Sequence, residues 1–99
     1  MFRTDKDVKD IVTKIVMEAL VAAANLDSVK AGRGDSNEVT SFLKSTVEES
    51  ARKTGLSLML MGPLTMVMPE FISARFSFLT ISNSGASISF EIEKTAYID

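Results

Sequence analysis

The stretch ARFSFLTISNSGASISFEIE, residues 74–93, decides the fold, because apolar and polar side chains alternate on both sides of a break that contains glycine. Alternation with a period of two is typical of a β-strand with one buried face. A three-residue loop with Gly85 in the left-handed conformation keeps the apolar side chains of both strands on one face, whereas a two-residue turn mixes the faces. The preferred register pairs Thr80 with Ile88, Phe78 with Phe90, Phe76 with Ile92 and Arg75 with Glu93.

The stretch LSLMLMGPLTMVM, residues 56–68, carries no charge and is apolar at nearly every position. A strand that is apolar on both faces is covered twice or lines an interface. Gly62 and Pro63 interrupt the stretch, and since proline donates no ladder hydrogen bond, the pair marks a kink, an edge or a reversal. We therefore expect one kinked strand or two strands here, within a sheet that covers residues 56–97.

Two helices are predicted before the sheet. Residues 5–26 repeat apolar side chains at helical spacing, and Thr4 with Asp7 is suited to cap the start of this helix. Residues 36–54 form an amphipathic helix that Gly55 ends. The expected fold is α+β, with two N-terminal helices packed on an antiparallel sheet of three to four strands, in the order α-α-β-β-β.

Length and composition favour a single domain over residues 1–99, since 99 residues of which 45% are hydrophobic suffice for one core. The net charge of −2 differs from the strongly basic balance of most nucleic-acid-binding domains. No apolar run approaches the ~20 residues that span a bilayer. No secretory signal is recognised either, so we expect a cytoplasmic protein without a membrane span that does not bind nucleic acid.

Apolar side chains outnumber the positions that a small two-layer core needs. Val16, Leu20 and Val21 lie off the main apolar stripe of the first helix, and a helix that is apolar nearly all round must be covered on more than one side. Leu79 and Ile81 fall on the polar face of the hairpin. Such surplus predicts a contact with a second copy or another protein. The interface candidates are Val16, Leu20, Val21, Met59, Met61, Leu79 and Ile81.

Four methionines between residues 59 and 68 raise the question of a copper(I) site, because thioethers are soft ligands. Methionine is more often a flexible side chain that fills cores and adapts to partners. We therefore assign these methionines to the core or to an interface, and expect no metal and no cofactor.

The segment GRGDS, residues 32–36, matches a short adhesion peptide that integrins recognise. Asp35 or Ser36 stands where the N-cap of the second helix belongs, with Glu38 three residues after Asp35, so the segment has a structural reason. Integrin binding through Arg33-Gly34-Asp35 also requires secretion and is not expected. The exposed N–H groups of the helix start suggest an anion site instead. Its candidate residues are Arg33, Gly34 and Ser36.

The sequence holds no histidine and no cysteine, which removes the commonest acid–base and nucleophilic groups. We assign no catalytic residue and favour a non-enzymatic interaction module. It self-associates or docks on a larger protein, as an accessory, inhibitor or assembly component does, for instance one encoded by a phage or mobile element. The alternative is a small-ligand or anion-binding protein, with an apolar pocket between the helices and the methionine-rich strand.

Overall fold

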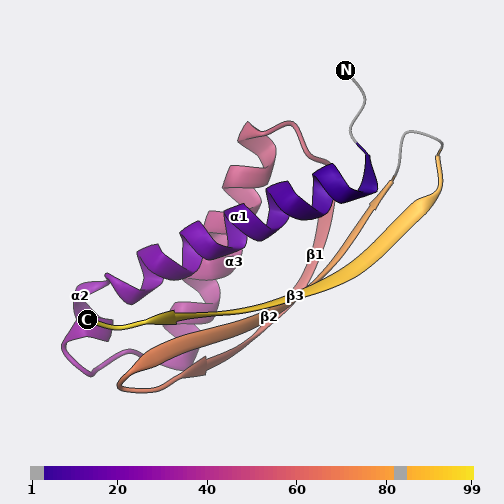
Figure 1. The fold of residues 1–99 in the computed structure, drawn as a ribbon. Coiled ribbons are helices and arrows are strands. Elements are labelled where there is room, and N and C mark those ends of the chain that lie inside the picture. Colours follow the sequence, from indigo (N-terminus) through magenta and orange to yellow (C-terminus); the bar gives the residue numbers. More distant parts are fainter. Residues whose placement is uncertain (1–3, 82–84) are drawn as a thin grey trace.

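The computed structural model describes residues 4–81 and 85–99, and shows an α+β fold in which helices precede strands, as predicted. The strands form one antiparallel sheet in the order β1-β2-β3, and the helices lie on one face of it (Figure 1). The elements are α1 (Asp5–Ala24), α2 (Asp27–Lys30), α3 (Ser36–Lys53), β1 (Leu58–Val67), β2 (Phe71–Ile81) and β3 (Ser87–Tyr97).

The predicted cap of α1 is confirmed. The Thr4 hydroxyl accepts a hydrogen bond from the Asp7 N–H at 3.1 Å, and the Asp7 carboxylate accepts one from the Thr4 N–H at 3.1 Å. The predicted end of this helix at Leu26 is wrong, because Asn25 is its C-cap and Leu26 is extended. The Asn25 amide donates to the Val21 carbonyl at 2.8 Å, and the chain then forms the short helix α2, which we did not predict.

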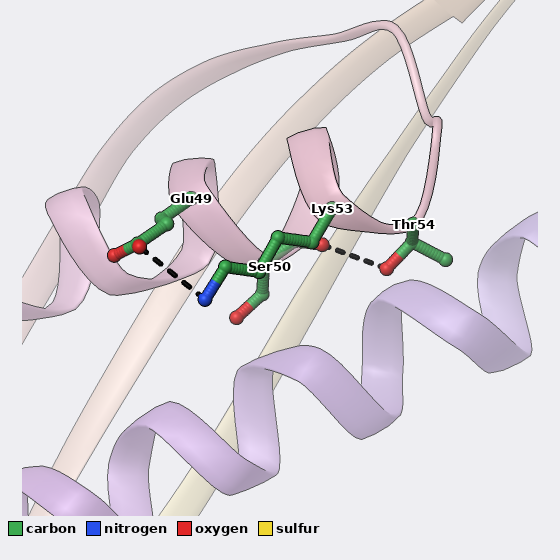
Figure 2. A network of polar contacts seen from close by, with 4 residues as sticks. All are labelled: Glu49, Ser50, Lys53 and Thr54. Carbon is green, nitrogen blue, oxygen red and sulfur yellow. Dashed lines mark hydrogen bonds and ion pairs between the residues drawn. The ribbon is translucent and has the colours of Figure 1, made fainter.

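The helix α3 begins and ends close to its predicted bounds. Its C-cap is Thr54, whose hydroxyl donates to the Ser50 carbonyl at 2.7 Å. One residue earlier in the chain, the Lys53 ammonium lies 3.4 Å from the Glu49 carboxylate (Figure 2). Both partners of this ion pair are exposed, so it stabilises the helix end by at most about 0.5 kcal/mol.

The register of the β2–β3 hairpin is the one that the alternation predicts. Thr80 pairs with Ile88, Phe78 with Phe90, Phe76 with Ile92 and Arg75 with Glu93. Gly85 has a φ of 87°, the left-handed conformation that we expected. The predicted three-residue loop falls in part on residues 82–84, which lie outside the described residues.

The uncharged stretch is one strand, β1, with an irregularity in the middle. Its pairing with β2 shifts by one residue between Met61 and Leu64, as happens at a β-bulge. Pro63 within the shift is buried against the core. Because the shift adds one residue, Met61 and Leu64 point to the same face of the sheet although they are three positions apart.

The core lies between the helices and the inner face of the sheet. Its largest fully buried side chains include Phe76, Phe78 and Leu43. The helix α1 packs against β2 and β3 on one side and against α3 on another. Val16 and Leu20 are therefore fully buried, and the expectation that they add to an exposed apolar surface is wrong. The second cover of α1 is a helix of the same chain.

Candidate interaction surface

The face of the sheet turned away from the helices is the surface on which most of the exposed apolar side chains gather. We call it the outer face. Among residues 4–81 and 85–99, no helix covers this face (Figure 1). Along β1, four large apolar side chains point outward, and about half or more of each is exposed. These residues, the methionine row, are Met59 (60% exposed), Met61 (49%), Leu64 (68%) and Met66 (55%).

The methionine row is extended at one end by β2. Met59 pairs with Leu79, which is half-buried, and Ile81 at the end of β2 is 71% exposed. Toward the other end, β2 becomes polar: Met61 pairs with Ser77 and Leu64 with Arg75. The apolar part of the outer face is therefore a continuous strip along β1 that widens onto β2 at one end.

The outward side chains of β3 have the opposite character. Glu91 and Glu93, the acidic row, are both exposed, and their neighbours on this face of β3 are two serines, Thr95 and, at the far end of the strand, the exposed Tyr97. The Ser77 hydroxyl donates to the Glu91 carboxylate at 3.3 Å. Arg75 pairs across the strands with Glu93, yet no ion pair within 4.0 Å joins them in the described part of the chain. The middle of the outer face is thus apolar along one edge and acidic along the other, and Phe71 with Tyr97 forms an aromatic pair at the far end of β2 and β3.

A shallow depression lies where these two halves meet, beside the register shift of β1. Its volume is about 310 Å³. Residues of the methionine row line it on the β1 side, and Arg75 of β2 and Glu93 of β3 also line it. The outward residues that line it are Leu64, Met66, Ser73, Arg75 and Glu93.

The two edges of the sheet are poorly suited to pairing with a further strand. The β1 edge is broken by Gly62 and Pro63, and a proline cannot donate the hydrogen bond that a new strand requires. The β3 edge carries Glu91, Glu93 and Lys94, and charged side chains on an edge strand disfavour association through it. The outer face, rather than an edge, is the better candidate for contact.

The seven interface candidates lie in three places. Four of them share the outer face: Met59, Met61, Leu79 and Ile81. Two others, Val16 and Leu20, lie in the core. Val21 is 49% exposed but belongs to a separate groove of about 310 Å³ between α1 and the end of β3, which Met17 and Tyr97 also line. Only four of the seven therefore form one surface.

The sequence reasoning did not select Leu64 and Met66 as interface residues, although both belong to the methionine row. Their alternation with Thr65 and Val67 placed them on one side of a strand. Leu64 and Met66 lie on the same face as Met59 and Met61 only because the register shifts at Gly62-Pro63, and periodicity alone does not reveal such a shift.

The anion-site candidates do not converge. The N-cap of α3 is Asp35, whose carboxylate accepts from the Asn37 N–H at 2.8 Å, so a negative group already occupies the helix start. Glu38 accepts from the Ser28 hydroxyl at 2.5 Å and adds a second carboxylate. Gly34 packs against Val29 at a small pocket of about 110 Å³, which neither Arg33 nor Ser36 lines. This arrangement gives an anion little attraction.

Residues 4–81 and 85–99 form neither a metal-binding cluster nor a membrane-spanning helix. No group of three or more histidine, cysteine, aspartate or glutamate side chains is placed to hold a metal ion. No helix within these ranges is long and apolar enough to cross a membrane.

Comparison with known proteins adds no relative: no family model, no curated protein and no solved structure matches this chain.

Proposed function

We propose that this chain is a small non-enzymatic interaction module, which docks on another protein or on a second copy through the outer face of its sheet. The observation that carries the proposal is the methionine row, four large apolar side chains exposed side by side on a face that no described helix covers. Single exposed apolar residues are ordinary, but a contiguous group marks a contact surface.

Burial of the methionine row would supply part of the free energy of such a contact. Fully burying a large apolar side chain is worth about 1.5–3 kcal/mol, and covering side chains that are already half-buried returns roughly half of that. Four such residues therefore contribute on the order of 4 kcal/mol before the costs of association. Methionine suits this role because its flexible thioether adapts to the shape of a partner.

Position-specific crosslinking tests the proposal in cells that express the protein. We would place a photoreactive amino acid at position 61 or 66 on the outer face, or at Lys44, which is exposed on α3. Positions 61 and 66 should each give one discrete crosslinked product, either a second copy or another protein, and position 44 should not. Met59→Asp, on the same face and two residues from position 61, should remove the product at that position. Equal labelling at all three positions would reject the outer face as the contact surface.

A second candidate function is supported by a pocket between α3 and β1, the place where the sequence favoured a ligand site. Its volume is about 80 Å³, and Phe78 forms part of its apolar lining, with Glu48 and Arg52 also lining it. This is smaller than the roughly 300–1,000 Å³ of most ligand sites, so it suits only a small apolar group. The remaining lining residues are Val47, Ala51, Leu56, Leu58 and Leu60.

A thermal-shift screen with small apolar compounds tests this second candidate. A compound that binds in the pocket should raise the Tm of the natural protein and leave that of Leu60→Trp unchanged, because the larger side chain fills the space. If no compound raises the Tm, or if the variant responds equally, the pocket is not a ligand site.

A further inference from the structure

The dimensions of the outer face match those of one α-helix. Three strands about 4.8 Å apart make a surface roughly 14 Å wide, and strands of 10 or 11 residues make it about 33–36 Å long. A helix is about 10–12 Å in diameter, and some 22 residues reach the same length. We propose that the outer face binds an amphipathic helix of a partner protein with lysine or arginine along one side of its apolar stripe, an inference that rests on the proposed function.

The inner face already shows how such a helix lies on this sheet. The helix α1, 20 residues long, follows β3 (Figure 1). Near one end of α1, the Lys9 ammonium lies 5.9 Å from the centre of the Phe90 ring. Near the other end, Val21 and Tyr97 line one groove. A partner helix along β2 on the outer face would place its apolar stripe over the methionine row and one flank over the acidic row.

The charges of the outer face select a basic flank. Glu91 and Glu93 stand against the single guanidinium of Arg75, which pairs across the strands with Glu93 without an ion pair. Among the described residues, one side chain donates a hydrogen bond to the Glu91 carboxylate, the Ser77 hydroxyl at 3.3 Å. A lysine or arginine above β3 therefore meets two exposed carboxylates, whereas an acidic flank is repelled by them.

The depression beside the register shift provides an anchor. With about 310 Å³ between Leu64, Met66 and Arg75, it accepts one large apolar side chain from the centre of the partner helix. Contacts of this kind, at the middle of an interface, carry most of its binding energy. Flexible methionines around the anchor allow helices of different sequence to fit.

A second copy fits this face less well. In a symmetric face-to-face dimer, the acidic row of one copy lies either over the acidic row or over the methionine row of the other, and both arrangements are unfavourable. If the two-fold axis runs across the strands, the acidic row faces the acidic row of the other copy, and like charges repel. If the axis runs along the strands, the methionine row covers Glu91 and Glu93 and leaves them without a polar partner. An offset dimer that joins only the methionine rows covers a strip of about 33 by 10 Å, well below the ~800 Å² per partner of a stable interface.

Two synthetic peptides of about 20 residues test the inference with the full chain. Both carry the same leucine stripe, and one has lysines and the other glutamates along one flank. Titration of the isotope-labelled protein followed by NMR should show that the lysine peptide binds about ten-fold more tightly than the glutamate peptide. The shifted resonances should be those of β1, β2 and β3 residues on the outer face.

Variants separate the two parts of the recognition. The double substitution Glu91→Gln and Glu93→Gln should bring the two peptides to within about three-fold of each other. Met61→Ser with Met66→Ser should weaken both peptides alike, since it removes apolar contact and no charge. The matched control, Asp10→Asn with Glu18→Gln, removes two exposed carboxylates from α1 and should leave both affinities unchanged.

Several results would overturn the inference. These are equal binding of the two peptides, shifts confined to α1 and α3, binding of neither peptide, or a dimer through this face that the lysine peptide does not displace. Its failure is distinct from failure of the proposed function. Crosslinks from position 61 to a second copy would reject the helical partner and keep the outer face as a contact surface, whereas absence of any position-specific crosslink would reject both.

Discussion

At the scale of single residues, apolar character did not by itself separate core from surface. Leu20 and Val21 are neighbours of similar hydrophobicity on α1, but Leu20 is fully buried and Val21 is 49% exposed. The difference arises because α3 and the sheet approach α1 from two directions and leave a narrow exposed side. Sequence periodicity shows how wide an apolar stripe is, and not which element covers it.

The burial of Leu20 predicts that its loss destabilises the fold. Leu20→Ala should reduce the free energy of unfolding by about 2–5 kcal/mol, through lost apolar burial and the cavity left behind. Met61→Ala on the outer face should change it by less than about 0.5 kcal/mol. Urea unfolding followed by circular dichroism measures both. Equal stability of the two variants would show that Leu20 does not lie in the core.

The cap of α1 offers a second test at this scale. Thr4→Ala removes the hydroxyl that accepts from the Asp7 N–H and should cost about 1 kcal/mol of stability. Thr4→Ser keeps an acceptor at the same place and should cost much less. The difference between the two variants in thermal unfolding isolates the hydrogen bond from the size of the side chain. If both lose the same stability, the cap contributes nothing.

At the scale of elements, the irregularity of β1 is the feature that creates the methionine row. Gly62 has a φ of +98°, and a Cβ added there would lie 3.3 Å from the Arg75 carbonyl oxygen. Gly62→Ala should therefore destabilise the protein by about 1–3 kcal/mol. Gly55 also has a positive φ, of +77°, but open space around it, so Gly55→Ala should cost less. Chemical denaturation of both variants gives the comparison.

The substitution Gly62→Ala would also affect which side chains of β1 point to the outer face. If Gly62→Ala removes the register shift instead of straining it, residues on one side of position 62 exchange faces. Methionines of one half of β1 would then point toward the core. NMR contacts across β1 and β2, such as those between Leu64 and Arg75, would report this directly. A variant that keeps both its stability and these contacts would contradict the role assigned to Gly62.

The hairpin was predictable because each strand has one apolar and one polar side, so a slip of one residue would bury serines and glutamates. The same argument fails for β1, where Met59 and Leu60 are both apolar and either face is acceptable. The end of α1 at Asn25 was also not predictable from periodicity. The Asn25 amide donates a hydrogen bond to the Val21 carbonyl, and the pattern of apolar residues does not report such a side-chain bond. The contrast between an apolar and a polar face made the register of the hairpin predictable. Because β1 lacks this contrast, its register could not be predicted.

At the scale of the whole molecule, the surplus of apolar side chains predicted from the sequence is present on the sheet but not on most of α1. Val16 and Leu20 are buried because α3 and the sheet both cover α1, whereas Val21 is half exposed. The sheet candidates Met59, Met61, Leu79 and Ile81 lie on the outer face, where the exposed apolar side chains gather mainly along β1. A two-layer fold with three strands leaves one sheet face exposed, so apolar side chains on that face have no cover from the described helices.

Chemical oxidation measures this distribution in one experiment. Dilute peroxide converts exposed methionines to sulfoxides, and Met59, Met61 and Met66 should react several-fold faster than Met17, which is partly buried on α1. Peptide mass spectrometry resolves the positions. A bound partner should slow oxidation of the methionine row and leave Met17 at its own rate, because only the row is covered. Prior oxidation should in turn weaken the partner, since a sulfoxide makes the row polar. If Met17 reacts as fast as the row, the row is not the exposed apolar surface that docking requires.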